Sequence, residues 1–188
     1  MHRIWSRALA VACFMAMAGL AHAADMVDNP AYQSWAKCKE GTTVTTKSST
    51  ETTVQGMADP MKTEATMTMK LVSITPDEVT VETTMSMGGS AMPATQQKIP
   101  AKLEKGKENG PMSDQMKDVK EGTDKVTVGG KTYDAKTREY TMEQNGMKSA
   151  VKVWTSDDVP GGMVKMESTV TGAANSKTTM ELVEVKQP

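Results

Sequence analysis

The chain has 188 residues, with 22 Lys and Arg against 23 Asp and Glu, 2 His and 2 Cys. This balance of charges argues against a nucleic-acid-binding protein, which needs a basic surface. Both histidines, His2 and His22, lie in the N-terminal segment described next. The rest of the chain can therefore build neither a Ser-His-Asp triad, nor a Cys-His pair, nor a histidine metal site.

Residues 1–23 are typical of a secretory signal peptide. Arg3 and Arg7 precede an apolar stretch at 8–20, and Ala21-His22-Ala23 has the small residues of a cleavage site. We expect cleavage near Ala23 and a secreted or periplasmic mature protein. The apolar stretch is short for a bilayer and no later stretch approaches it, so no transmembrane segment is expected in the mature chain.

The mature chain keeps one cysteine, Cys38. Without a histidine to activate it, we expect a quiet buried thiol rather than a nucleophile. In an oxidising compartment the alternative is a disulfide between two chains. Lipidation at Cys13 is not favoured, because Ala10 stands where a lipoprotein signal has a leucine-like residue.

One short helix is expected at the start of the mature chain. Asn29 is a good N-cap, Pro30 suits the first helical position, and the helix continues to Cys38 with Tyr32 and Trp35 on one face. After Gly41 the sequence alternates with a period of two and is rich in Val and Thr, which indicates β-strands. The predicted strands are 42–54, 64–74, 79–87, 95–103, 124–128, 131–143, 147–156, 162–171 and 177–186.

The short connections between these segments favour antiparallel meander pairing. We predict a mainly β protein: a curved antiparallel sheet, shaped as an incomplete barrel, with a short N-terminal helix. Residues 24–188 should form a single domain. Residues 104–122 are charged and are expected as a flexible loop, with a helical turn from Met112 to Glu121. Further loops are expected at 57–61 and 88–93, and a two-residue turn at Gly129-Gly130.

The hairpin at Asn145-Gly146 has a register set by its two-residue turn. Gln144 should pair with Met147, which places Glu143 opposite Lys148 and Glu139 opposite Lys152 on one side. The other side is apolar and supplies the first predicted ligand-binding residues: Arg138, Tyr140, Met142, Val151 and Val153. The one arginine of the mature chain, Arg138, can hold a carboxylate or phosphate there. Alternatively it reaches solvent or a nearby acid.

Methionine occurs 18 times, and two Met-x-Met pairs complete the predicted ligand-binding residues. Met67 and Met69 share one face of a strand, as do Met85 and Met87 on the next. The two faces meet only if the loop at 75–78 is odd in length or a strand contains a bulge. The four methionines are then core or cavity lining, or alternatively thioether ligands of Cu(I).

The last hairpin should place Thr171 opposite Lys177, which puts Val164, Met166, Val170, Met180 and Leu182 on one face. The chain also contains a short internal echo, since residues 68–74 resemble residues 179–185. It records either a duplication or the same packing solution reached twice.

Nothing in the sequence distinguishes one pair of carboxylates as a general acid and base. Asp157-Asp158 fits a tight turn better than a calcium-binding loop. We therefore expect a non-enzymatic role and no cofactor. The third class, an enzyme, would need carboxylates that converge in a cleft. The sequence favours a binding or carrier protein for a lipid or another apolar or amphiphilic small molecule, with an apolar cavity of about 300 Å³ or more. The alternative is an interaction module that pairs through exposed strand edges, its concave face filled by the helix and the methionines.

One stretch carries a resemblance: Val153-Trp154-Thr155-Ser156-Asp157-Asp158-Val159-Pro160-Gly161-Gly162-Met163-Val164-Lys165, preceded by Gly129-Gly130-Lys131-Thr132-Tyr133. It resembles secreted bacterial proteins of unassigned activity that share a W-x-S-x-D-V-P-G-G-x-V-K stretch. The resemblance covers the C-terminal third and implies export, but no functional residue. The layout of a helix followed by a curved sheet is similar, in architecture alone, to LolA/LolB-like lipoprotein carriers. That similarity implies an incomplete barrel with an apolar cavity.

Overall fold

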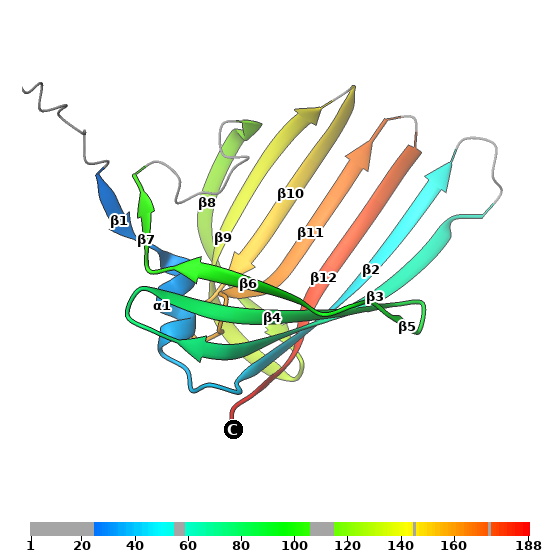
Figure 1. The fold of residues 1–188 in the computed structure, drawn as a ribbon. Helices are drawn as coiled ribbons and strands as arrows, with labels where there is room; N and C mark the ends of the chain where they lie inside the picture. Colours follow the sequence, from blue (N-terminus) through cyan, green and yellow to red (C-terminus); the bar gives the residue numbers. More distant parts are fainter. Residues whose placement is uncertain (1–24, 55–58, 106–114, 145, 173) are drawn as a thin grey trace, which may run out of the picture.

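The computed structural model describes residues 25–54, 59–105, 115–144, 146–172 and 174–188. Within them, ten strands form one antiparallel sheet, two more form a separate ribbon, and one helix, α1 (Pro30–Ala36), lies near the N-terminus. The sheet is curved and open (Figure 1), so the predicted fold class is confirmed. The predicted signal peptide lies outside the described residues.

Nine strands follow one another across the main sheet, and β6 joins it at one edge. In order they are β5 (Ser90–Ala91), β4 (Glu78–Met87), β3 (Met61–Ile74), β2 (Thr43–Val54), β12 (Ala174–Lys186), β11 (Met163–Thr171), β10 (Met147–Thr155), β9 (Lys131–Gln144) and β8 (Lys117–Val128). The strand β6 (Thr95–Pro100) also pairs with β4, and β1 (Met26–Asp28) pairs with β7 (Lys102–Glu104). No helix among the described residues is long and apolar enough to cross a membrane.

The strand boundaries differ from the prediction most over 95–103 and 117–122. In addition, β3 and β12 each begin three residues earlier than predicted, and β5 lies in the predicted loop 88–93. Residues 95–103 are divided between β6 and β7, because the chain leaves β4 at Ala101, whose N–H donates to the Asp77 carbonyl. The strand β8 begins at Lys117, so the predicted loop and helical turn are wrong over 117–122. This segment is an exposed edge of the sheet, and it therefore lacks the apolar alternation that marks a strand with one buried face.

The helix begins as its sequence predicts, but it ends at Ala36 rather than at the predicted Cys38. The Asn29 side chain accepts a hydrogen bond from the Ala31 N–H at 3.0 Å, and Pro30 occupies the first turn. Trp35 is the buried residue of α1, and the Tyr32 hydroxyl donates to the Thr75 carbonyl at 2.8 Å. These contacts fix the helix against the turn between β3 and β4.

The hairpin of β9 and β10 has the predicted register, with Gln144 opposite Met147 and Arg138 opposite Val153. The hairpin of β11 and β12 differs by two residues, since Lys177 pairs with Thr169 rather than Thr171. Pairing continues closer to the turn than expected. A shift of two residues preserves the side to which each residue points, so the predicted faces of these strands are retained.

Bulges keep apolar residues on one face of the sheet. The pairing of β3 with β4 shifts at Val72, and the pairing of β12 with β2 shifts at Val183. The extra residues are themselves 38% and 49% exposed. The bulge at Val72 places Met67 directly opposite Met85, as the sequence analysis required. It also accounts for the internal echo, because the bulge follows Leu71 in one copy and Leu182 in the other.

The two faces of the sheet differ sharply in charge. The concave face, toward α1, carries no Lys, Asp or Glu on the described parts of β2, β3, β4, β10, β11 and β12, nor on β9 from Arg138 onward. Lys and Glu occupy the convex face, where they form cross-strand pairs such as Lys152–Glu139 at 2.8 Å. The register thus sorts nearly all charge to one side.

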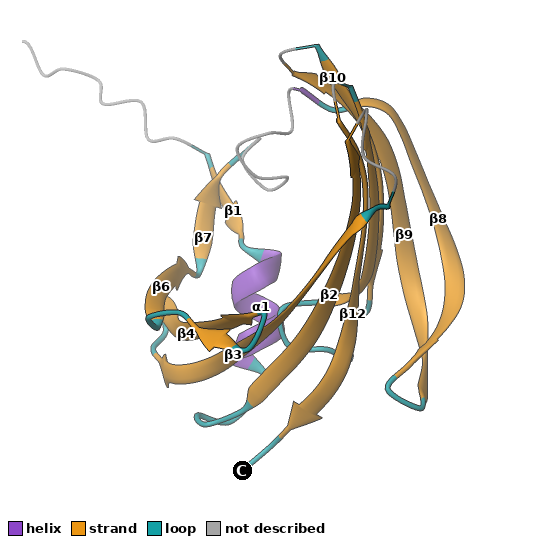
Figure 2. Ribbon diagram, turned by 90° about the vertical axis from the view of Figure 1, so that its right-hand side faces the viewer, coloured by secondary structure: helices purple, strands orange, loops and turns teal. Residues whose placement is uncertain are grey.

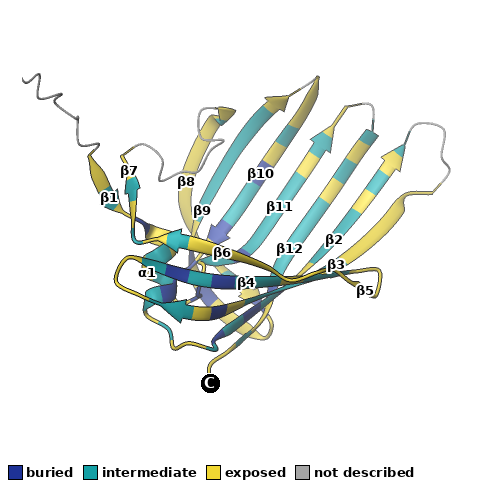
Figure 3. Cartoon of the chain, in the orientation of Figure 1, coloured by how far each residue is buried: buried dark blue, intermediate teal, exposed yellow. Residues whose placement is uncertain are grey.

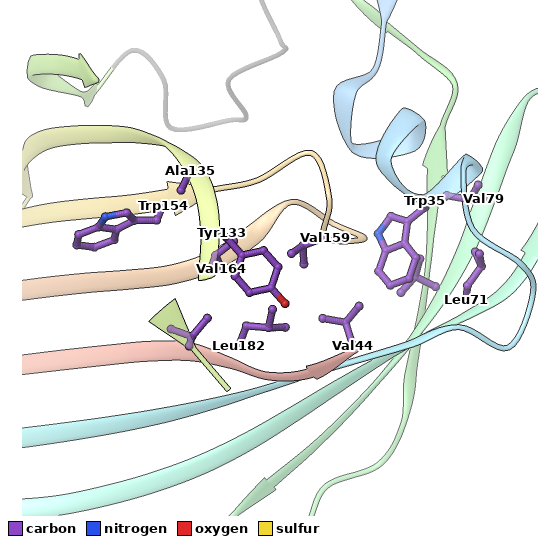
Figure 4. Packing of buried hydrophobic residues seen from close by; sticks show 12 residues of the cluster. Trp35, Val44, Leu71, Val79, Tyr133, Ala135, Trp154, Val159, Val164 and Leu182 are labelled. Carbon is purple, nitrogen blue, oxygen red and sulfur yellow. The ribbon is translucent and has the colours of Figure 1, made fainter. Parts of the chain in front are cut away.

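The helix fills the lower part of the concave side. The strands β4 and β6 fold over it, so that α1 lies between them and the main sheet (Figure 2). Trp35 packs there among Val44, Leu71 and Val79 (Figure 4), and Val159 from the β10–β11 connection joins the same core. Buried residues gather in this lower region, whereas the upper parts of the strands alternate between half-buried and exposed (Figure 3).

A second packed region lies on the convex face. The strands β8 and β9 fold back on the side of the sheet opposite to α1 (Figure 2). Trp154, only 6% exposed, donates its indole N–H to Asp124 at 3.1 Å. The ammonium groups of Lys152 and Lys165 lie 4.9 and 5.4 Å from its ring centre, within range of a cation–π interaction. Trp154 thus joins β10 to this hairpin, whose tip, Gly129-Gly130, lies beside Val183 of β12 at Gly129.

We expect Gly129→Ala to destabilise the protein more than Gly130→Ala. Both glycines have positive φ, so alanine costs each of them about 1–2 kcal/mol. Only at Gly129 would the new Cβ also lie 2.6 Å from a backbone atom, the Val183 carbonyl oxygen, whereas the space at Gly130 is open. Urea unfolding followed by tryptophan fluorescence would measure both. Equal losses would contradict docking of the tip on β12.

The Asp124–Trp154 contact should weaken in acid. The hydrogen bond from Trp154, with a second from the Lys125 N–H, lowers the pKa of Asp124. A lowered carboxyl pKa stabilises the fold above the ordinary Asp value of about 3.9, and that contribution is lost as pH falls through the native pKa. In Asp124→Asn, the free energy of unfolding should therefore fall less steeply as the pH is lowered. Asp77→Asn, in the β3–β4 turn, is the control for removing one carboxylate.

Candidate functional site

The open upper part of the concave face is the candidate site, and we call it the trough. Its floor is the layer of Leu182 and Val164, which are buried against the helix core. Above that layer the side chains are half-buried, with Val151 the exception. The trough is lined by Met67, Met85, Ser48, Thr50, Met180, Thr178, Met166, Ser168, Val153, Val151, Tyr140 and Met142, by strand register.

The predicted ligand-binding residues form two separate groups within this face. Arg138, Tyr140 and Met142 on β9 lie beside Val151 and Val153 on β10. The four methionines lie on β3 and β4. Between β3 and β10 stand β2, β12 and β11, so the groups are four strand spacings, or about 19 Å, apart along the sheet. They occupy opposite sides of the trough rather than one cluster.

The four predicted methionines do not share one environment. Met67 and Met85 are directly opposite and half-buried, while Met69 packs against the core. Met87 is 47% exposed, so the expectation that all four face the interior is wrong for this residue. It lies at the open end of β4, next to β5, where the sheet no longer curves over the helix.

More methionines point to the concave face than the four in the two Met-x-Met pairs. By register, nine methionines point to it: Met61, Met67, Met69, Met85, Met87, Met142, Met147, Met166 and Met180. Met166 and Met180 are a second directly opposed pair. Thioether side chains are flexible and polarisable, which suits a surface that must adapt to an apolar partner.

A strip of hydroxyl groups on β2, β12 and β11 was not predicted as part of the site. It comprises Ser48, Thr50, Thr52, Ser176, Thr178 and Ser168. Within it the hydroxyls of Thr50 and Thr178 are 3.0 Å apart and hydrogen-bonded. The trough therefore has a hydroxyl-bearing strip along its middle strands, between the methionines of β3 and β4 and the apolar side on β9 and β10. The signal in the sequence was the alternation of Ser and Thr over 48–52 and 174–178.

Arg138 lies at the edge of the trough, where Glu121 of β8 is opposite it and on the same face by register. Its side chain is 32% exposed, and its Nε lies 3.9 Å from a carboxylate oxygen of Glu121, which β8 places opposite it. Val153 faces it across the pair with β10, and Val153 is in turn opposite Met166. A guanidinium thus ends a row of apolar side chains.

Hollows among the described residues are larger on the convex side than in the trough. A recess of about 150 Å³ at the upper end of the trough is lined by Met142, Met147, Ser149, Val170 and two glutamines. It is smaller than the predicted cavity. A convex hollow of about 500 Å³ lies between β8 and β10–β11, but its lining is charged and includes the ion-paired Lys152 and Glu139.

Among the described residues, no group of three or more His, Cys, Asp or Glu could hold a metal ion. Asp157 forms an ion pair with Lys136 at 2.9 Å, which lowers its pKa, and Asp158 lies in the turn after Ser156. Burial raises the pKa of the free Cys38 thiol, whose Sγ donates to the Ser34 carbonyl, so it stays protonated.

No family profile matches this chain, and no curated protein matches it in sequence. Among solved structures, a protein assigned as a lipoprotein from Parabacteroides distasonis is 16% identical with a TM-score of 0.48, covering 79% of this chain and 96% of its own. A protein assigned as exported, with a YmcC-like fold, from Bacteroides fragilis is 12% identical with a TM-score of 0.49, covering 80% and 97%.

A third solved structure is a domain assigned to an outer membrane lipoprotein-sorting protein from Vibrio parahaemolyticus. It is 9% identical, with a TM-score of 0.26, covering 84% of this chain and 90% of its own. At these values no family and no functional residue is transferred from the three structures. The resemblance carried by residues 153–165 stays a prediction.

A Met67→Leu/Met85→Leu variant would show whether these two methionines line an apolar wall or bind Cu(I). If they line an apolar wall, each change should cost less than about 1.5 kcal/mol, because leucine has a similar volume. Neither the variant nor the parent would then take up Cu(I) tighter than micromolar in competition with bathocuproine. Tight uptake by the parent that disappears in the variant would identify a copper site instead.

Proposed function

We propose that this protein is an exported, non-enzymatic binding or carrier protein for an apolar or amphiphilic small molecule, which it holds in the trough. The observation that carries the proposal is the division of the concave face. Its lower half is filled by α1 and buried, whereas its upper half is equally free of Lys, Asp and Glu but left half-exposed. An uncharged surface that the protein does not cover itself is suited to covering by a ligand.

The binding mode follows from the lining of the trough. Val153, Tyr140 and Met166 offer apolar contact on the side of β9–β11, and burying such surface contributes about 25 cal/mol per Å². Ser48, Thr50 and Thr178 offer hydroxyl groups on the adjoining middle strands β2 and β12. A molecule with an apolar body and polar substituents meets both. The signal-like segment at 1–23 supports a periplasmic or secreted location, with residues 24–188 as one domain.

Pairing through strand edges is a weaker alternative. The outer edge belongs to β8, whose residues are exposed except for Val126 and Val128 at its end and include Lys117, Lys120 and Glu121. Charged edge strands resist pairing with other chains. Copper binding is a second candidate, because Met67 directly faces Met85 and both are half-buried.

A bulky residue placed in the trough should block binding. Ser168 on β11 points to the trough and its neighbour Thr169 points to the convex face. We expect Ser168→Trp to lower the affinity for the neutral fluorescent probe N-phenyl-1-naphthylamine by about ten-fold or more, since a filled pocket loses its apolar contacts. Thr169→Trp is the matched control and should bind normally.

Three outcomes separate the alternatives in this experiment. No binding of the probe by the parent would contradict a carrier. A loss with Thr169→Trp alone would move the site to the convex hollow, which Thr169 lines. Native mass spectrometry of protein from its own compartment should in addition show a co-purifying amphiphile that Ser168→Trp loses.

A further inference from the structure

The middle strands of the trough become more polar away from the helix. Along β12, the concave residues from the open end to the floor are Ser176, Thr178, Met180 and Leu182. The positions of β11 that lie opposite change from Ser168 to Met166 in the same direction. An amphiphile that lies along these strands would therefore place its apolar part toward the floor and its polar part toward the open end.

The polar part of these strands is built from hydroxyl groups. Thr50 and Thr52 of β2 lie directly opposite Thr178 and Ser176 of β12, and we call these residues the hydroxyl patch. All of them are half-buried. In the described parts of β2, β12 and β11, no Lys, Arg, Asp or Glu shares this face. The patch therefore offers hydrogen bonds without a net charge.

One hydrogen-bond donor within the patch is left for a ligand. The hydroxyls of Thr50 and Thr178 are 3.0 Å apart, and one donates to the other. That bond uses one of the two hydroxyl hydrogens, because a hydroxyl has a single O–H and accepts through its lone pairs. Within the described structure neither side chain forms a second hydrogen bond. The accepting hydroxyl can therefore donate to a carbonyl or hydroxyl oxygen of a bound molecule.

An apolar row adjoins the patch on the side of the floor. Met180 follows Thr178 by two residues on β12, a rise of about 7 Å, and it lies directly opposite Met166. Val153 of β10 is opposite Met166 in turn. The row Met180, Met166, Val153 thus crosses two strand spacings, about 10 Å, with flexible thioethers at its start. An alkyl chain that begins at the patch can pack along it.

A charged head group on the patch would have no counter-ion on this face. The nearest charged side chains of the described concave face are Arg138 and Glu121, which lie beside each other at the β8–β9 edge. The strand β9 is three strand spacings, about 14 Å, from β12. An ion placed on the patch would therefore lose part of its hydration without gaining an ion pair, which is unfavourable.

We propose that the trough prefers an uncharged amphiphile such as a monoacylglycerol, whose ester and hydroxyl oxygens bind to the hydroxyl patch while its alkyl chain packs along Met180, Met166 and Val153. This inference rests on the proposed function, because it assigns the ligand class of the same site. The ester carbonyl accepts the hydrogen left by the Thr50–Thr178 pair. The glycerol hydroxyls donate to the oxygens of the patch.

The test compares amphiphiles that share a saturated chain of equal length. 1-Monolauroylglycerol, dodecanoate and dodecyltrimethylammonium would each compete with bound N-phenyl-1-naphthylamine, below their micellar concentrations and at about pH 8, where dodecanoate is ionised. We expect the neutral ester to displace the probe at a concentration about ten-fold lower than either ion, because only the ions lose hydration without compensation. Glycerol, which lacks the chain, should not displace the probe.

A double variant assigns the preference to the patch. Thr50→Val/Thr178→Val keeps the shape of both side chains and removes both partners of the hydrogen bond, so no orphaned group remains. It should still bind the neutral probe, which shows that the trough is intact. Its affinity for 1-monolauroylglycerol should fall about ten-fold, while the affinities for the two ions stay unchanged. Thr179→Val is the matched control, because Thr179 points to the convex face, and it should change nothing.

The outcomes distinguish this inference from the function on which it rests. If none of the three amphiphiles displaces the probe, the carrier function itself is contradicted. If either ion binds as tightly as the ester, or if the preference survives the double variant, the trough binds amphiphiles but the hydroxyl patch does not select their head group. Displacement by glycerol would show a site for small polar molecules and would contradict both.

Discussion

The alternation of side chains along a β-strand is the constraint on which this structure depends. Each strand contributes every second residue to one face. A face free of Lys, Asp and Glu therefore requires the charged residues of each strand to occupy the intervening positions. In this chain the rule holds across six neighbouring strands and on β9 from Arg138 onward, where Lys and Glu lie on the convex side. Two consequences follow from one pattern: charge pairs stabilise the outer face, and the inner face is left for the helix and for a ligand.

Bulges make that pattern compatible with strands that bend over the helix. After Leu71 and Leu182, one additional valine in each strand is turned outward, and Ile74 and Val185 return to the inner face against the core. Without Val72 the two methionine pairs would face opposite ways. Both strands flank β2, so the repeated sequence solves the same geometric problem on its two sides.

The sequence predicted what depends on local alternation and missed what depends on the arrangement of the sheet. The helix cap at Asn29, the register at Gln144 and Met147, and the need for a bulge all followed from neighbouring residues. The strand character of 117–122 did not, because an exposed edge has no buried face to impose alternation. The separation of Arg138 from Met67 was also not predictable, since pairing of β12 with β2 brings distant segments between them.

The low content of bulky residues explains why half of the concave face stays open. Trp35 is the one large aromatic that α1 inserts, and it fills only the layer of Val44, Leu71 and Val79. The other tryptophan of the described residues, Trp154, is committed to the convex side, where its indole N–H donates to Asp124 of β8 and two lysines lie over its ring. Nothing of comparable size remains in the described strands to cover Val153, Met166 and Met180. Stability therefore comes from the lower half and the outer face, which allows the upper inner face to keep flexible methionines where a bound molecule can pack against them.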